Sequence, residues 1–285
     1  MGQIFADYDF ESEYDKQIEK IEEWETEKIF RKNKLGCLYM TRTTKAGNQI
    51  ELDIYPAFRS RHDLPRGERK NRTKKAMRNL NQRRAERKLT EIINANFTEK
   101  DLWCTWTYKD GFLPASIEEA QEKFRKFIRR VNNWRKRRGL GNVKYVVVTE
   151  FHEDPDKGIR VHHHALMSGD MDRDSLEILW KYGKRNQTRR LDPDDFGLSG
   201  IASYISKDPQ GRKRWSTSRN LKKPKVTHAL GKFSKRRVEK MAKDHAYLQE
   251  QIEKRYPEYR FLDAKVCVNE INSGFYVYAR MVRRT

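Results

Sequence analysis

The chain has 285 residues, and its 62 Lys and Arg against 41 Asp and Glu give a formal net charge of +21. No apolar run approaches the roughly 20 residues that a helix needs to cross a bilayer, which excludes a membrane-spanning protein. Three scattered cysteines, Cys37, Cys104 and Cys267, favour free thiols in a reducing cytoplasm over a disulfide scaffold. A cytoplasmic protein of this charge is expected to bind a polyanion, and nucleic acid is the first candidate.

Residues 1–98 are expected to form a basic, largely helical N-terminal extension. A helix-like stretch covers residues 12–32, and residues 47–55 alternate apolar with polar side chains in a strand that ends at Pro56. Residues 57–75 contain Pro, Gly and many charges without an apolar period, which predicts a basic loop. A helix with one apolar and one basic face is expected over residues 76–96.

A β-α-β-β pattern follows. The aromatic and β-branched run LWCTWTY at residues 102–108 predicts a strand, and Ser116 with Glu119 forms a capping box at the start of a helix. Residues 144–151 and 160–167 predict a hairpin. The order of these elements indicates an α+β fold. The remaining expected elements are helices over residues 172–182, 198–206 and 234–254 and strands over residues 260–268 and 274–282.

The strand at residues 160–167 carries three consecutive histidines. Side chains alternate across a strand, so His162 and His164 share one face while His163 points to the other. Two imidazoles two residues apart on one face form a natural metal-binding pair. We expect His163 to lie in the core or at the surface without a chemical role.

A carboxylate on the neighbouring strand completes this predicted metal site. If the turn centres near Asp156, Glu150 lies opposite His162, and a register shifted by two residues puts it opposite His164. In either register Glu150 faces the same side as the pair. A His-His-Glu set with open positions is typical of a catalytic metal site. His152, close to the turn, is a weak additional ligand candidate.

Tyr204 and Lys207, in the sequence GIASYISKDP, are the candidate catalytic pair. On a helix they are three residues apart and lie on one face. A phenol is a poor nucleophile at its ordinary pKa near 10, but it becomes effective beside a cation when the electrophile is polarised by a metal. A Tyr-x-x-Lys pair alone is weak evidence, and its weight comes from its position about 40 residues after the histidines.

The third candidate site is a basic segment with an aromatic residue. Between Lys207 and Lys240, Lys and Arg outnumber acidic residues by 13 to 2. Basic side chains neutralise phosphates, hydroxyls and amides bond them, and a Trp can stack on an unpaired base. The alternative is a solvated loop with Trp215 in the core. The candidate DNA-binding residues are Arg212, Lys213, Arg214, Trp215, Ser216, Ser218, Arg219, Asn220, Lys222 and Lys223.

Taken in order, LWCTWTY, the HHH of VHHHALM and the YISK of SYISK resemble the motifs of the HUH endonucleases, specifically the rolling-circle replication initiators of bacterial plasmids, phages and mobile elements. The resemblance covers about residues 99–285, which divides the chain into residues 1–98 and an endonuclease domain at 99–285. One departure is His163, where a bulky hydrophobic residue is usual. With a single tyrosine in the catalytic window, the chain resembles the single-tyrosine class.

The resemblance implies a central antiparallel sheet with helices on one face, and Mg²⁺ or Mn²⁺ held by Glu150, His162 and His164. Tyr204 would then nick single-stranded DNA at a replication origin, forming a 5′-phosphotyrosine and leaving a 3′-OH that primes a host polymerase. Reversal would rejoin the strand. The sequence contains no Gly-x-x-x-x-Gly-Lys-Ser/Thr, so a host helicase is expected to separate the strands in the cytoplasm of a bacterial host.

Other functions fit the same residues. A conjugative relaxase or a transposase would use the same chemistry in another biological context. A zinc hydrolase would use the His-His-Glu set without a covalent intermediate and would not need Tyr204. A non-enzymatic nucleic-acid-binding protein would tolerate the loss of both His162 and His164.

Overall fold

The computed structural model describes residues 5–14, 16–32, 36–60, 73–151, 160–183, 186–206, 215–269 and 274–284. These residues form an α+β structure with two antiparallel sheets, which confirms the predicted fold class but gives two sheets where one was expected. The chain divides into two compact units, residues 1–81 with 224–285, and residues 82–223. None of the helices in the described part of the chain is long and apolar enough to cross a membrane.

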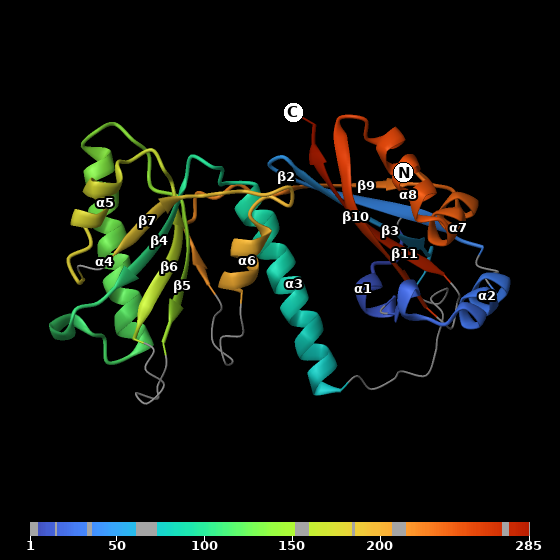
Figure 1. Ribbon diagram of the computed structural model, residues 1–285, viewed down its shortest axis with the longest axis horizontal. Coiled ribbons are helices and arrows are strands. Elements are labelled where there is room, and N and C mark those ends of the chain that lie inside the picture. The colour runs from blue at the N-terminus through green and yellow to red at the C-terminus, as the bar shows by residue number, and fades with distance from the viewer. Residues whose placement is uncertain are drawn as a thin grey trace. The chain divides into compact units, whose positions relative to one another are not determined.

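The unit of residues 82–223 contains a five-stranded antiparallel sheet. The strands, in spatial order, are β7 (Gln187–Arg190), β4 (Leu102–Thr107), β6 (His162–Met167), β5 (Tyr145–Glu150) and β8 (Ser216–Thr217). Figure 1 labels β7, β4, β6 and β5. The hairpin predicted from the sequence is therefore β5 and β6, and the strand with the three histidines occupies the centre of the sheet. Both of its neighbours can place side chains beside those histidines.

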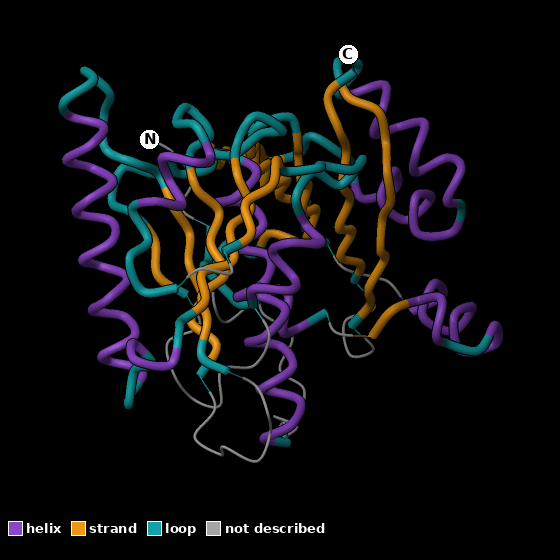
Figure 2. Tube along the Cα trace, turned by 60° about the vertical axis from the view of Figure 1, so that its left-hand side comes forward, coloured by secondary structure: helices purple, strands orange, loops and turns teal. Residues whose placement is uncertain are grey.

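Helices lie on both faces of this sheet (Figures 1 and 2), whereas one covered face was expected. Helices α4 (Ile117–Lys136) and α5 (Arg173–Ile178) pack on one face, and α3 (Lys74–Asn94) and α6 (Ser199–Ile205) pack on the other. Helix α4 begins at the predicted cap, because the Ser116 hydroxyl accepts the backbone N–H of Glu119. The Glu119 carboxylate in turn accepts the N–H of Ala115.

Each face has its own hydrophobic core. Trp106 and Phe127 are fully buried between the sheet and α4, and Leu89 and Leu166 are fully buried between the sheet and α3. Full burial of one such side chain contributes about 1.5–3 kcal/mol to stability. The strands are thus packed on both sides, which fixes their register and the direction of each side chain.

The second unit contains a six-stranded antiparallel sheet. Its strands, in spatial order, are β1 (Lys16–Gln17), β10 (Tyr259–Val268), β11 (Phe275–Arg283), β3 (Gln49–Ala57), β2 (Leu38–Ala46) and β9 (Lys225–Leu230). One face is covered by α2 (Glu23–Lys32), α7 (Lys235–Lys243) and α8 (His245–Arg255). The opposite face carries a tyrosine-rich cluster that includes Tyr14 and Tyr276.

The N-terminal region differs from the predicted helical extension. Strand β3 pairs with β2 on one side and with the C-terminal β11 on the other, so both ends of the chain build one sheet. The boundaries of the compact units do not coincide with the predicted division after residue 98. That division came from the span of the family resemblance, and it stays a prediction. The loop predicted for residues 57–75 lies largely outside the described residues.

Tertiary contacts also interrupt two predicted helices. The stretch at residues 12–32 contains the end of α1 (Phe10–Glu13), then β1, a 3₁₀ turn (Ile18–Lys20) and α2, because Tyr14 is buried and Lys16 pairs with Val268. The helix expected over residues 234–254 is α7 followed by α8. They separate at Asp244, whose carboxylate accepts the N–H of Tyr247 and so starts a new helix.

Candidate active site

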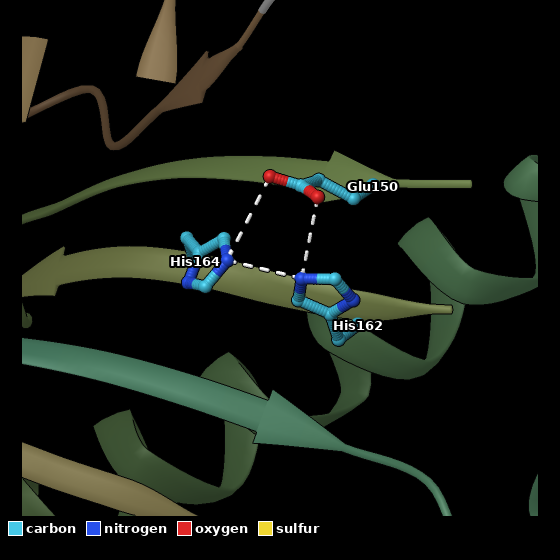
Figure 3. A group of neighbouring side chains, drawn as sticks. All are labelled: Glu150, His162 and His164. Carbon is cyan, nitrogen blue, oxygen red and sulfur yellow. Dashed lines mark hydrogen bonds and ion pairs between the residues drawn. The ribbon is translucent and has the colours of Figure 1, made fainter. Parts of the chain in front are cut away.

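Strands β5 and β6 bring the predicted ligands together. Glu150 lies directly opposite His162, which is the register expected for a turn near Asp156, and His164 lies opposite Val148. The alternation along β6 places His162 and His164 on the face of Glu150, and all three side chains point toward one another (Figure 3). The predicted His-His-Glu cluster is confirmed as a geometric fact.

The three side chains approach each other closely. The Nε2 atom of His162 is 3.4 Å from Oε2 of Glu150, and Nε2 of His164 is 3.7 Å from Oε1. The two Nε2 atoms are 3.0 Å apart. Within the described ranges this is the one cluster of three or more His, Cys, Asp or Glu side chains whose donor atoms could share a metal ion.

The other ring nitrogens are held by neighbouring groups. Nδ1 of His162 is 2.8 Å from the carbonyl oxygen of Arg160, which can only accept a hydrogen bond, so Nδ1 carries the proton and Nε2 of the neutral ring keeps its lone pair. Nδ1 of His164 is 3.1 Å from Oγ1 of Thr105 on β4. Such outer contacts orient imidazole ligands at metal sites.

The electrostatics of the cluster fit a divalent cation. Burial is the main cause that lowers the pKa of His164 to about 4; His162 lowers it further, while Glu150 opposes the shift. His164 is therefore neutral at pH 7 and available as a ligand. Two imidazole nitrogens and one carboxylate, with all donor atoms within 4.8 Å of one another, are a donor set that accommodates a borderline or hard divalent ion.

Tyr204, on α6, lies beside this cluster. Its hydroxyl is 3.2 Å from Nε2 of His164, and its ring meets the edge of Trp103 with 6.0 Å between centroids. Trp103 in turn stacks on His164 at 5.2 Å. The Tyr204 side chain remains 39% exposed, so it can meet an external substrate. Partial burial and the Glu150 carboxylate raise the pKa of Tyr204, and positive charge at the cluster would oppose that effect.

His163 points to the opposite face, as predicted. It is fully buried, with Nε2 2.6 Å from the Tyr108 hydroxyl and Nδ1 2.9 Å from Oγ1 of Thr149. Burial, followed by the charges of His162 and His164, lowers the pKa of His163 to about 3. The ring is thus a neutral, hydrogen-bonded part of the core.

The candidate DNA-binding residues have varied surroundings. Trp215 is half-buried against the core between the sheet and α3. The Ser218 hydroxyl accepts the N–H of Tyr145, and the Asn220 amide donates to the carbonyl of Asn142. Ser216 is half-buried in β8, whereas Arg219, Lys222 and Lys223 are exposed. Their role in DNA binding stays a prediction. Three further candidates, Arg212, Lys213 and Arg214, lie outside the described residues, as do the catalytic candidate Lys207 and the weak ligand candidate His152.

Sequence reasoning missed two residues of the site. Thr105 and Trp103 both lie on β4 and contact His164. The alternation of LWCTWTY places them on one face of a strand, but nothing in the sequence says that β4 pairs with β6. That pairing, Thr105 opposite His164 and Trp103 opposite Leu166, comes from the structure.

Comparison with known families agrees with this site. Residues 101–209 match the family model of the Replication-associated protein ORF2/G2P, a rolling-circle initiator family of the HUH type, which confirms the predicted resemblance over this segment. The matched segment runs from β4 past α6 and contains Glu150, His162, His164 and Tyr204. No curated protein and no solved structure matches the chain.

Proposed function

We propose that the chain is a rolling-circle replication initiator, a metal-dependent nickase and strand-joining enzyme that acts on single-stranded DNA at an origin through a 5′-phosphotyrosine. One observation carries the proposal: the Tyr204 hydroxyl lies 3.2 Å from a nitrogen of the His-His-Glu cluster, within the segment that matches the replication-associated family. A relaxase or transposase would use the same residues in another context.

In this proposal Glu150, His162 and His164 hold one divalent cation, Mg²⁺ or Mn²⁺. When bound, such a cation neutralises the scissile phosphate and polarises its phosphorus. The hydrogen bonds of the two Nδ1 atoms, to the Arg160 carbonyl and to Thr105, keep both Nε2 atoms directed at the site. The zinc hydrolase alternative shares these ligands, so the ligands alone do not separate the two functions.

Tyr204 is the proposed nucleophile. Its oxygen forms a bond to phosphorus as the phenolic proton leaves, the bond from phosphorus to the 3′ oxygen breaks, and that oxygen takes up a proton to become a 3′-OH. The reverse attack by a 3′-OH rejoins the strand and frees Tyr204. The number of phosphodiester-type bonds stays constant, so no ATP is consumed. Lys207 is proposed to lower the Tyr204 pKa or to stabilise charge on the phosphate.

The basic residues and the expected partners complete the proposal. Exposed Arg219, Lys222 and Lys223, with the neighbouring basic residues, would bind the DNA backbone by charge. The 3′-OH would prime a host polymerase, and a host helicase would separate the strands in the cytoplasm of a bacterial cell. A charge-based interface also predicts that DNA affinity falls as salt rises.

The test is covalent capture of labelled DNA. Overlapping single-stranded oligonucleotides covering both strands around the gene are incubated with protein and Mn²⁺, and adducts are resolved on a denaturing gel and mapped to a peptide. We expect an adduct on Tyr204 and none with Tyr204→Phe, which removes the attacking oxygen. Tyr182→Phe, a change at another half-buried tyrosine of the same unit, should still form the adduct. Cleavage by Tyr204→Phe at the wild-type rate would favour the hydrolase instead.

A second measurement tests the basic segment. Replacing Arg212, Lys213 and Arg214 by Ala should weaken binding of the same oligonucleotides and flatten the salt dependence by about 0.7 log units per lost contact. The matched control replaces Lys235, Arg236 and Arg237 on α7, which belong to the other compact unit and are not among the candidate DNA-binding residues. An unchanged salt slope in the first variant would remove this segment from the interface.

A further inference from the structure

Helix α6, which carries Tyr204, is short. It has seven residues, and its N-cap residue Leu198 has no side chain that can cap the helix. A helix of two turns is not stable in water by itself. The position of the Tyr204 hydroxyl therefore depends on what holds α6 from outside.

Both ends of α6 are bonded to side-chain amides of α3. The Gln82 amide donates to the carbonyl oxygen of Ser206 at 2.7 Å, at the C-terminal end of α6. The Asn94 side-chain oxygen accepts the N–H of Leu198 at 2.9 Å, at the N-terminal end. Since the earlier residue of α3 meets the later residue of α6, the two helices run antiparallel.

Apolar packing joins the two helices between these amides. Leu89 and Ile93 of α3 belong to the same buried cluster as Ala202 and Ile205 of α6, and all four are at most 1% exposed. The contact at the N-terminal end is close enough to require glycine: a Cβ on Gly197 would lie 2.6 Å from the Asn94 oxygen, and its φ of 68° also favours glycine.

A third amide extends this arrangement. Asn96, just beyond the end of α3, donates to the carbonyl of Lys222 at 2.8 Å and accepts its N–H at 2.7 Å. The chain before residue 207 and the chain after residue 214 are therefore both bonded to α3 or its C-terminal extension. These are the two segments that flank the centre of the basic stretch.

We propose that Gln82 and Asn94 are positioning residues of the reaction: they hold the two ends of α6 so that the Tyr204 hydroxyl lies beside Nε2 of His164. The inference rests on the proposed role of Tyr204 and deepens it. It assigns a role in nucleophile placement to α3, a helix that precedes the segment matching the family and that sequence reasoning placed in the N-terminal region.

The Gln82 amide donates a hydrogen bond and the Asn94 amide accepts one, so the two positions should respond differently to the same substitution. A backbone carbonyl only accepts, so Gln82 must donate, and a backbone N–H only donates, so Asn94 must accept. Gln82→Glu keeps the shape but loses the donor, whereas Asn94→Asp keeps the acceptor. The same change of amide to carboxylate should therefore be harmful at one end of α6 and tolerated at the other. Asn94→Leu, which removes the acceptor, should be harmful.

The first readout is the single-turnover rate of adduct formation with the oligonucleotide that the wild type cleaves, at saturating DNA and Mn²⁺. We expect Gln82→Glu and Asn94→Leu to slow it at least about tenfold with unchanged DNA affinity, since small displacements of a nucleophile are costly. Asn94→Asp should stay within about twofold. Asn81→Asp is the charge control, because Asn81 is the exposed residue just before Gln82 on the same helix.

The second readout does not need activity. 3-Fluorotyrosine at position 204 reports by ¹⁹F NMR on the rings of Trp103 and His164 that surround it. Gln82→Glu and Asn94→Leu should move its resonance toward that of free fluorotyrosine, and Asn94→Asp and Asn81→Asp should not. An unmoved resonance, or a rate loss explained by weaker DNA binding, would overturn the inference. If the wild type forms no adduct but the variants show the expected shifts, the proposed function is wrong, while the placement of Tyr204 by α3 is supported.

Discussion

The two faces of strand β6 both carry histidines, but the surroundings of these histidines differ. On one face His162 and His164 turn their Nε2 atoms toward each other and toward Glu150. On the other face His163 lies in the core, bonded on both ring nitrogens to the hydroxyls of Tyr108 and Thr149. Burial lowers the pKa of His163 and of His164 alike, so burial does not separate them.

What separates the two faces is the chemistry of the neighbours. Hydroxyl groups can donate or accept, so the core around His163 satisfies a neutral ring. His164 also meets hydroxyls, those of Thr105 and Tyr204. Its Nε2 atom has in addition another imidazole nitrogen at 3.0 Å and a carboxylate oxygen at 3.7 Å, a set of lone pairs that a cation would satisfy. The same residue type therefore serves packing on one face of the strand and belongs to a possible metal site on the other.

The largest expected effect is on the site face. His162→Ala or His164→Ala should lower the rate of adduct formation by about 1,000-fold or more, because a bound cation contributes several kcal/mol to phosphate chemistry. DNA affinity should change little, since it depends on Lys and Arg. Adduct assays with filter binding on the same samples check this. Wild-type cleavage by both variants would contradict a metal site on this face.

The next effect is on the core face and concerns stability. His163→Phe should keep adduct formation within about threefold at 20 °C, because the side chain points away from the site. It removes the partner of two hydroxyls, Tyr108 and Thr149, and should lower the free energy of unfolding by about 1–3 kcal/mol. Urea unfolding followed by circular dichroism measures this. Loss of cleavage in a folded His163→Phe protein, with cleavage kept in His162→Ala, would mean that His163 and not His162 belongs to the active site.

The assignment of the three histidines to the two faces of β6 could be predicted from the sequence. Strict alternation along VHHHALM sorts the three histidines, and any register of the hairpin in steps of two residues keeps Glu150 on the side of His162 and His164. The capping box at Ser116 and the hairpin of β5 and β6 were equally local signals. They could be predicted because each depends on residues close together in the chain.

Long-range pairing could not be predicted. β2 and β9 are polar and basic strands whose place comes from pairing with β3 and β2. Pro56 was expected to end β3, yet it lies inside the strand. The pairing with β11 ends at Ile54, so the missing N–H of Pro56 removes no hydrogen bond between these two strands. The Gly47–Asn48 turn between β2 and β3 was a local hairpin signal that the sequence analysis missed.

A smaller effect tests how the site face is held. Thr105→Val removes the hydroxyl at 3.1 Å from Nδ1 of His164 and nearly preserves the side-chain shape. Loss of such an outer contact typically weakens metal binding about 10- to 100-fold, so we expect about tenfold weaker Mn²⁺ binding by calorimetry. Thr149→Val, which removes the corresponding contact to His163 on the core face, is the matched control and should leave Mn²⁺ affinity unchanged.

The smallest effect is a pH dependence that belongs to the core face. Burial lowers the pKa of His163 to about 3, while the unfolded chain has the ordinary value of 6.5. Between these values the unfolded state binds a proton that the folded state does not. The contribution of His163 to the free energy of unfolding is therefore fully present above about pH 6.5 and decreases as the pH drops toward 3. From pH 7 to 5.5 this one group should cost about 1 kcal/mol.

His163→Phe should remove that part of the slope, since phenylalanine cannot titrate, and its stability should therefore approach that of the wild type as the pH falls. Urea unfolding of both proteins at pH 7.0, 6.0 and 5.5, without added metal, measures the difference. His164 titrates in both proteins, so its contribution cancels between them. Parallel pH profiles for wild type and His163→Phe would mean that His163 is protonated in the folded state, which a core bounded by the hydroxyls of Tyr108 and Thr149 does not favour.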